Sequence, residues 1–329
     1  MCVPDTSYLS SPDFLIISSH ILLCLDIPIL SYGAYCILFR TPSAMNSVKW
    51  LMLSLHCWSS LLDITLSFFG IPYIFLPFAG GYGLGVYDDP KAWIYLGLLL
   101  VVAVDASIIL IYENRYYMLY ARHTYWARVR KPCLAAIFII SFLQCQLPFV
   151  VVPDQPTARQ TIIDSLPCPP AFSLPDREMF VLSPSKRLPL IYLTAAFFIL
   201  TPPIVGFFTL TFYHLIKRTS TVSRKTQQLQ RQVIIALMLQ SSFLLAFLDG
   251  PLFAVCATMI FQYHYQGLNN VIFLVLAMHG IGSTIVMLLV HRPYQEFTFS
   301  LLCCRSRTSN YKNKTARLFS PTVAPLHLT

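Results

Sequence analysis

Charged residues are scarce in this sequence of 329 residues, of which only 11% are Asp, Glu, Lys or Arg. Ordinary soluble domains carry about 25%, so the chain has too few charges to cover a surface in water, which argues against a soluble enzyme. Catalytic signatures are also missing: the sequence contains no G-x-S-x-G, H-E-x-x-H, C-x-x-C or G-x-x-x-x-G-K-[ST]. We therefore expect a protein that is not an enzyme and that needs no metal or other cofactor.

Apolar residues make up 56% of the chain and gather in seven long stretches, none of which contains a Lys or an Arg. About 20 residues of helix cross a hydrocarbon core of about 30 Å, and the lack of water there forces the backbone to satisfy its hydrogen bonds within the helix. The sequence therefore predicts an all-α, seven-transmembrane helix bundle. The predicted spans are 14–39, 50–78, 92–112, 132–152, 188–215, 232–260 and 268–290.

The basic residues predict the orientation of the bundle. Of the 23 Lys and Arg residues, 18 lie on one side of the predicted spans, which places the N-terminus outside and the C-terminus in the cytosol. We interpret the basic surplus as this topology, and not as a sign of a nucleic-acid partner. The segment 153–187 is expected to fold over the outer mouth of the bundle. Residues 1–304 form the predicted helical domain and residues 305–329 a solvated cytosolic tail.

Four cysteines lie outside the predicted spans at informative places. Cys2 and Cys168 are the only pair on the oxidising outer side, so a disulfide between them is available, with two free thiols as the alternative. Past the seventh span, residues 295–304 predict a short interfacial eighth helix that ends at Cys303 and Cys304. Their position next to apolar side chains predicts palmitoylation and contact with membrane lipid.

Four carboxylates lie within the predicted spans, where a charge costs about 2.5–3.5 kcal/mol on insertion scales. Asp26, Asp63 and Asp105 each lie near the middle of a span, and Asp249 lies in the outer half of the sixth. If the helices bring them together, Asp63 and Asp105 predict an internal cation or proton site. The alternative for each is a neutral, hydrogen-bonded side chain that faces the bundle. The histidines of the spans, among them His279, match no metal motif.

Short motifs in a fixed order carry a resemblance to a known family. They are Leu-Leu-Asp ending at Asp63, Glu-Asn-Arg-Tyr from Glu113 to Tyr116, Leu-Pro-Cys-Pro around Cys168, and His-Arg-Pro-Tyr from His291 to Tyr294. In order and spacing the chain up to about residue 304 resembles the nematode serpentine chemoreceptors of class H, a divergent family of G-protein-coupled receptors. The resemblance implies a receptor in the plasma membrane, and in the ciliary membrane of sensory neurons, that binds a small-molecule cue and activates a heterotrimeric G protein.

The resemblance also implies residue roles. The residues expected to couple to the G protein are Glu113, Arg115, Tyr116, Lys225, Arg231, Pro293 and Tyr294. The residues expected to bind the cue are Phe247, Asp249 and Phe253. The chain departs from rhodopsin-like receptors at Asn114, which separates acid from base. Because residues two apart on a helix point to different faces, Glu113 is poorly placed to restrain Arg115.

Two other functions fit the same seven spans. A seven-span ligand-gated ion channel or transporter would use Asp26, Asp63 and Asp105 along an ion path. A structural or trafficking membrane protein would show no signalling in response to a cue. The position of the N-terminus separates the receptor from insect-type odorant channels, in which the N-terminus lies inside.

Overall fold

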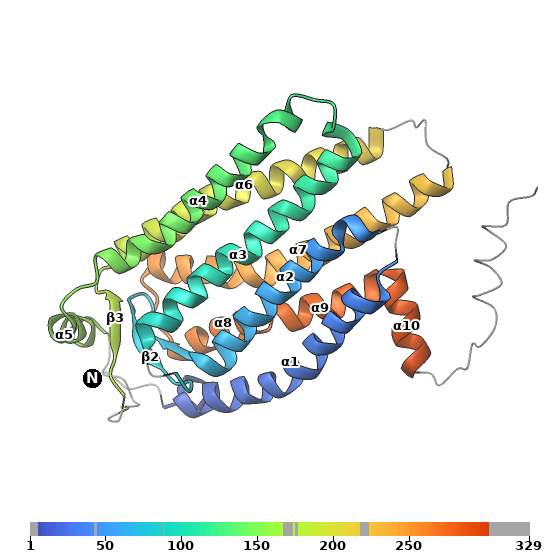
Figure 1. Ribbon diagram of the computed structural model, residues 1–329. Coiled ribbons are helices and arrows are strands. Elements are labelled where there is room, and N and C mark those ends of the chain that lie inside the picture. The colour runs from blue at the N-terminus through green and yellow to red at the C-terminus, as the bar shows by residue number, and fades with distance from the viewer. Residues whose placement is uncertain are drawn as a thin grey trace, which may run out of the picture.

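The computed structural model describes residues 6–42, 45–87, 89–166, 174, 177–217 and 224–302. Long helices run side by side through most of it (Figure 1). We call the end of the bundle at which α1 starts the outer end, and the opposite end the inner end. The elements are η1 (Tyr8–Ser10), α1 (Pro12–Arg40), α2 (Asn46–Ile64), η3 (Thr65–Phe69), β1 (Pro72–Ile74), β2 (Ala79–Gly83), α3 (Pro90–Tyr116), η4 (Tyr117–Ala121), α4 (Trp126–Val150), α5 (Gln155–Ser165), β3 (Phe180–Ser183), α6 (Arg187–Lys217), α7 (Arg224–Phe261), α8 (Gln266–Ala277), α9 (His279–Val290) and α10 (Arg292–Leu302).

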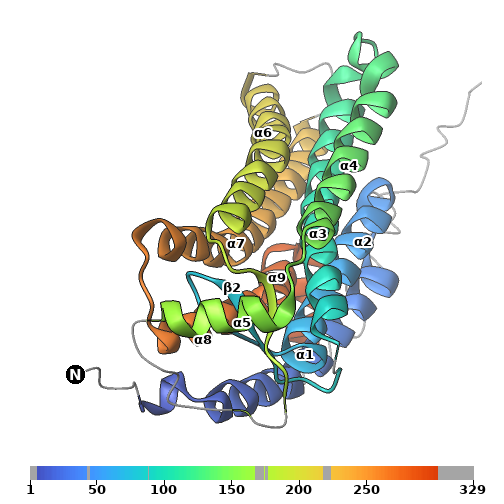
Figure 2. The same cartoon turned by 90° about the vertical axis from the view of Figure 1, so that its left-hand side faces the viewer.

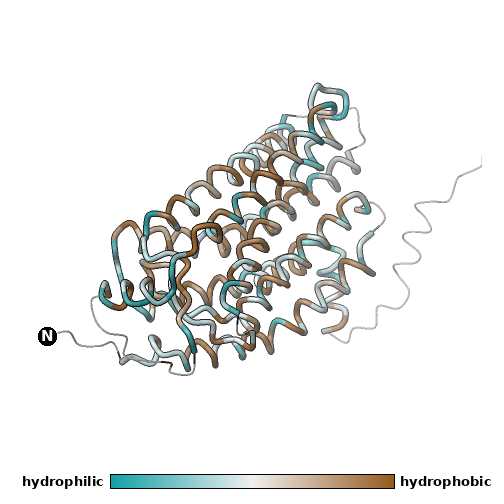
Figure 3. The backbone as a smooth tube through the Cα atoms, turned by 60° about the vertical axis from the view of Figure 1, so that its left-hand side comes forward, coloured by the Kyte–Doolittle hydropathy of each residue, from teal (hydrophilic) through white to brown (hydrophobic). Residues whose placement is uncertain are grey.

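Six helices in these ranges are long and apolar enough to cross a membrane, and α8 with α9 makes a seventh span that bends by 41°. Hydrophobic stretches follow the helices, while hydrophilic ones gather toward the ends of the bundle (Figure 3). The seven-helix bundle predicted from the sequence is confirmed. The predicted seventh span is broken at Met278, between the end of α8 and the start of α9.

Several helices begin at side chains suited to cap them. The hydroxyl of Ser11 accepts a hydrogen bond from the backbone N–H of Phe14 at the start of α1. The carboxylate of Asp89 accepts from Lys91 and Ala92 at the start of α3. In both helices a proline follows the capping residue, where its missing N–H costs nothing. The local sequence thus sets where these two helices begin.

The second span is shorter than predicted, since it ends at Phe69 and not at Phe78. The helix closes in the π-helical turn η3, and Ile71 then adopts a positive φ of 41°. The apolar residues that extend the predicted span belong to β1 and to the turn that follows it, where Tyr73 and Phe75 are buried. Burial against other loops, and not against lipid, thus accounts for their hydrophobicity.

A small antiparallel sheet in the order β1-β2-β3 covers the outer end. Strands β1 and β2 form a hairpin after the second span, and β3 comes from the long loop before α6, which folds over the outer mouth as predicted. A Cβ on Gly81 would lie 2.2 Å from the carbonyl oxygen of Tyr73, so the hairpin requires glycine there. Seen from the outer end, α5 and β2 lie across the bundle (Figure 2). The sheet joins two loops into one cap.

The inner end is closed on one side by α10, the short eighth helix that the sequence predicts. It packs against α1 and α9 and runs across the ends of the spans (Figure 1). The hydroxyl of Tyr294 is hydrogen-bonded to that of Thr41 at 2.7 Å, and Tyr32 is bonded to Thr298 at 3.0 Å. The guanidinium of Arg40 lies 3.8 Å from the ring centroid of Phe297. These contacts fix α10 to the first span.

Candidate functional site

A cavity of about 540 Å³ opens at the inner end of the bundle. Its walls come from the inner end of α3 with η4, from residues 232–236 of α7, from the connection between α1 and α2, and from the junction of α9 with α10. Arg115, Gln232, His291 and Pro293 are among the residues that line it. Most of the side chains that line it are apolar, and Arg115 and Arg292 add positive charge.

Arg115 places an unpaired guanidinium at the inner cavity. The atoms Nε and Nη2 of its guanidinium are buried and have no hydrogen-bond partner among the described residues. Glu113, two residues earlier, does not approach it. Its carboxylate accepts from Arg130 at 2.6 and 2.8 Å and from the indole N–H of Trp126 at 2.8 Å. The expectation that Glu113 leaves Arg115 unrestrained is confirmed, and α4 supplies the reason.

His291 lines the same cavity at the end of α9. Its Nε2 lies 3.3 Å from Oε1 of Gln240 on α7. Burial, together with the nearby positive charge of Arg115, lowers the pKa of His291 to about 4, so the ring is neutral at physiological pH. A neutral imidazole keeps this wall of the cavity compatible with the arginine.

The other residues expected to couple to a G protein lie in different surroundings. Pro293 lines the inner cavity, whereas Tyr116 packs on His214 of α6. Tyr294 is fully buried, which raises the pKa of its hydroxyl. Arg231 is exposed at the inner end of α7, and the side chain of Lys225 lies outside the described part of the chain. As G-protein contacts all of them stay predictions.

Asp63 belongs to α2 and lies against the bend of the seventh span. Its Oδ1 is 2.7 Å from Nδ1 of His279, and its oxygens accept from the backbone N–H groups of Gly280 and Ile281 at 3.2 and 3.1 Å. All of these groups are buried. The carboxylate therefore satisfies the first N–H groups of α9, which have no partner within their own helix.

The other buried carboxylates have fewer partners. Neither oxygen of Asp26 has a hydrogen-bond partner in the described ranges, and its electrostatic neighbours are Asp63 and His279. Asp105 interacts with Asp249 across α3 and α7. The part of the chain that the structure describes contains no group of three or more His, Cys, Asp or Glu side chains arranged to hold a metal ion. A cation or proton site at Asp63 and Asp105 stays a prediction.

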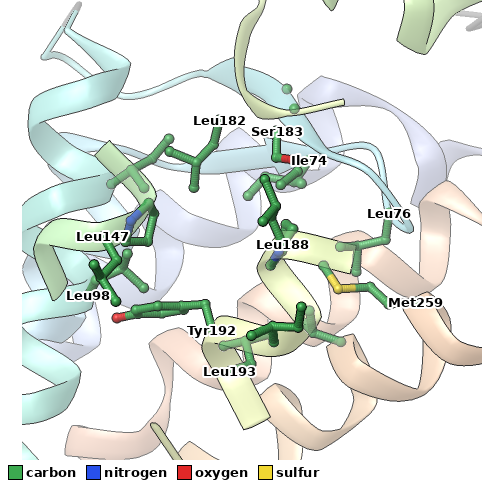
Figure 4. Close-up of a pocket in the computed structure, with 18 of the residues that line it drawn as sticks. Ile74, Leu76, Leu98, Leu147, Leu182, Ser183, Leu188, Tyr192, Leu193 and Met259 are labelled. Carbon is green, nitrogen blue, oxygen red and sulfur yellow. The ribbon is translucent and has the colours of Figure 1, made fainter. Parts of the chain in front are cut away.

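A second cavity, of about 430 Å³, lies at the outer end (Figure 4). It lies between α3, α4, α6 and α7 and under the outer sheet. The close-up shows Leu98, Leu147, Leu188 and Tyr192 around it, with Leu182 of β3 above. Of its lining, Tyr192 and the strand residues are not identified by the sequence analysis. For β3 the signal is the short apolar run 180–182 inside the long loop, whereas nothing local marks Tyr192.

The side chains expected to bind a cue do not line this outer cavity. Phe247 stacks on Phe243 with ring centroids 4.3 Å apart, and Phe253 is exposed and packs edge-on against Phe197. Asp249 faces Asp105. As ligand contacts the three stay predictions. The cysteines expected to form a disulfide, Cys2 and Cys168, and those expected to be palmitoylated, Cys303 and Cys304, lie outside the described residues, as does the tail 305–329.

The fold defines a multi-pass membrane protein of the seven-helix type. The crystal structure of squid rhodopsin has a similar fold, with a TM-score of 0.60 at 13% sequence identity, over 99% of this chain and 94% of that chain. Residues 10–304 match the family described as serpentine type 7TM GPCR chemoreceptor Srh, and the chain belongs to that family. It is 27% identical over 315 residues to serpentine receptor class H-72 of Caenorhabditis elegans. That alignment covers 91% of this chain and 89% of the relative.

The resemblance drawn from the sequence motifs is therefore confirmed. The family is one of receptors of the G-protein-coupled type and not one of enzymes. Its match extends from the start of α1 to the end of α10, so both cavities lie within the matched range.

Proposed function

We propose that this protein is a chemosensory receptor that binds a small-molecule cue in the outer cavity and activates a heterotrimeric G protein at the inner cavity. One observation carries the proposal: α3 and α7 each line both cavities. Trp93 and Met259 belong to the outer cavity, and Arg115 and Gln232 to the inner one. A change in the packing of either helix at one end therefore reaches the other end.

The proposed mechanism is a shift between two arrangements of the helices. A cue that binds one arrangement more tightly increases its population by that difference in affinity. Two features give the bundle places to bend. Pro251 lies within α7 next to Leu252 of the outer cavity, and the seventh span bends at Met278. Movement at these points would change the width of the inner cavity.

The G protein would meet Arg115 in the inner cavity. A guanidinium with unused N–H groups forms strong hydrogen bonds to carbonyl or carboxylate oxygens of a partner. Around the cavity, the exposed Lys217 and Arg231 would face anionic lipid of the cytoplasmic leaflet or the G protein itself. The proposed location is the plasma membrane, in the cilium of a sensory neuron.

The test expresses the full chain with a promiscuous G protein and screens small molecules for nucleotide exchange. Arg115→Ala should abolish the response at unchanged surface level. The matched control is Arg122→Ala, which removes an exposed arginine near the same end of the bundle but not from the cavity. An unchanged response of Arg115→Ala would contradict the coupling role. A cue-evoked ionic current without a G protein would instead support the channel or transporter.

A further inference from the structure

The lining of the outer cavity restricts the chemistry of what it can hold. No Asp, Glu, Lys or Arg is among the described residues that line it. Two of its polar side chains bond within the protein: Nε2 of Gln144 donates to the carbonyl of Tyr192 at 3.0 Å, and the hydroxyl of Ser183 donates to the carbonyl of Ser185 at 2.8 Å. The indole N–H of Trp93 is buried and has no hydrogen-bond partner among the described residues, so it is a neutral donor. A charged ligand would lose its hydration in this cavity without gaining a residue of opposite charge among the described lining.

The cavity is covered on the side that faces external water. Gly80 and Gly81 of the hairpin are buried above it, and β3 extends the cover. The cap is held from both sides. Gln155 of α5 exchanges two hydrogen bonds with the backbone of Val181, at 2.9 and 3.0 Å, and Nη1 of Arg177 donates to the carbonyls of Gly83 and Gly85. Entry from water would require these bonds to open.

The cavity is bordered differently on the side of α4 and α6. At the outer ends of these two spans the lining side chains are exposed and apolar: Leu147 is 62% exposed and Ile191 is 64% exposed, and Val150 and Leu188 extend the same rim. Because both helices cross the membrane, this rim faces the acyl chains of the outer leaflet. An apolar molecule is already concentrated there by partitioning.

We propose that the outer cavity takes a neutral, apolar small molecule, which enters sideways from the outer leaflet between α4 and α6. The volume of about 430 Å³ lies at the small end of the range of ligand pockets, about 300–1,000 Å³, and fits one compact molecule and not a lipid with two acyl chains. This inference rests on the proposed function, for which it names the ligand class and the route of entry.

The test uses photolabelling of the full chain in phosphatidylcholine nanodiscs, without a G protein. The probe is a neutral medium-chain alkyl ketone that carries a diazirine, compared with an alkyl trimethylammonium of the same length and diazirine. We expect the ketone to label residues of the outer cavity, and the ammonium probe to label them at least about tenfold less. Equal labelling by the two probes would overturn the ligand class.

The route is tested with two tryptophan variants on α4. Leu147→Trp narrows the rim and should lower the rate of labelling by about tenfold. Ile139→Trp, at a site that is 57% exposed but does not line the cavity, should leave the rate unchanged. Both sites are exposed, so both variants should fold, and Ile191→Trp repeats the test from α6.

Arg177→Ala separates the two routes, because it loosens the cap without touching the rim. Lateral entry predicts an unchanged rate of labelling for this variant. A faster rate with Arg177→Ala, together with an unchanged rate for Leu147→Trp, would overturn lateral entry. Labelling without cue-dependent nucleotide exchange would refute only the proposed function, whereas exchange driven by charged cues alone would refute only this inference.

Discussion

Asp63 of α2 holds His279, the first residue of α9, with Oδ1 and Nδ1 2.7 Å apart and both side chains fully buried. The same carboxylate accepts the N–H groups of Gly280 and Ile281. The first N–H groups of a helix need an acceptor from outside it, and here the acceptor comes from a neighbouring helix. The bend of the seventh span therefore depends on a residue of the second.

Removing this carboxylate should destabilise the bundle strongly. Asp63→Ala leaves the buried N–H groups of Gly280 and Ile281 without their acceptor and leaves His279 with only the carbonyl of Leu276. The loss of one partner of a buried pair costs about 3–5 kcal/mol of unfolding free energy. Denaturant unfolding in detergent micelles measures this loss of unfolding free energy. Asp13→Ala, an exposed carboxylate in the first turn of α1, should cost at most about 1 kcal/mol. Equal losses for the two variants would refute the role of Asp63 at the bend.

A single methyl group should disturb the same contact. A Cβ on Gly280 would lie 2.3 Å from Oδ2 of Asp63, so Gly280→Ala forces the two helices apart and should cost about 1–3 kcal/mol. At Gly206 of α6 a Cβ would meet no atom within 4 Å, and Gly206→Ala should stabilise by about 0.5–1 kcal/mol. Opposite shifts of the melting temperature are expected, and shifts of the same sign would count against the close approach.

The ion pair of Glu113 with Arg130 predicts a stability effect separate from signalling. Arg130→Met leaves the fully buried carboxylate without its cation and should cost about 3 kcal/mol. Adding Glu113→Gln removes the uncompensated charge and should restore part of that loss. Arg128→Met changes an exposed arginine on the same helix and should fall within about 0.5 kcal/mol of the parent. If the double variant is no more stable than Arg130→Met, the result contradicts the pairing.

His291 predicts how stability depends on pH. Its pKa is about 4 in the folded protein against about 6.5 when unfolded, so the folded state resists protonation. Its contribution is fully present above about pH 6.5 and is lost as the pH falls toward 4, by up to about 3 kcal/mol.

The variant His291→Gln keeps a donor for Gln240 but cannot titrate, and its stability should fall less than that of the parent over this range. His123→Gln removes an exposed histidine and serves as the control. Parallel pH curves for the parent and His291→Gln would show that His291 is not the titrating group.

The spans were predictable because a single rule decides them: backbone in lipid must bond within its own helix, and about 20 apolar residues are enough. The same rule misjudged the segment after Phe69. There Tyr73 and Phe75 are as apolar as a span, but they are buried by β3 and α5, which lie far along the sequence. Hydropathy records burial and does not distinguish lipid from protein.

The site was predictable in part. Arg115 and Pro293 were selected from motifs, and both line the inner cavity. The pairing of Glu113 with Arg130 was not, because the two lie 17 residues apart and meet only through the packing of α3 on α4. Tyr192 of the outer cavity lies in an unbroken apolar run, where nothing local marks one residue as facing the cavity.

The side chains of strand β3 lie alternately on two faces of the outer sheet. Phe180 and Leu182 line the outer cavity, while Val181 between them belongs to the apolar cluster under α5. Substitutions of Phe180 and Leu182 can change the shape of the outer cavity and leave the seven spans unchanged. Under the proposed function, selectivity for a cue can therefore change through a few loop residues without a change in the seven spans.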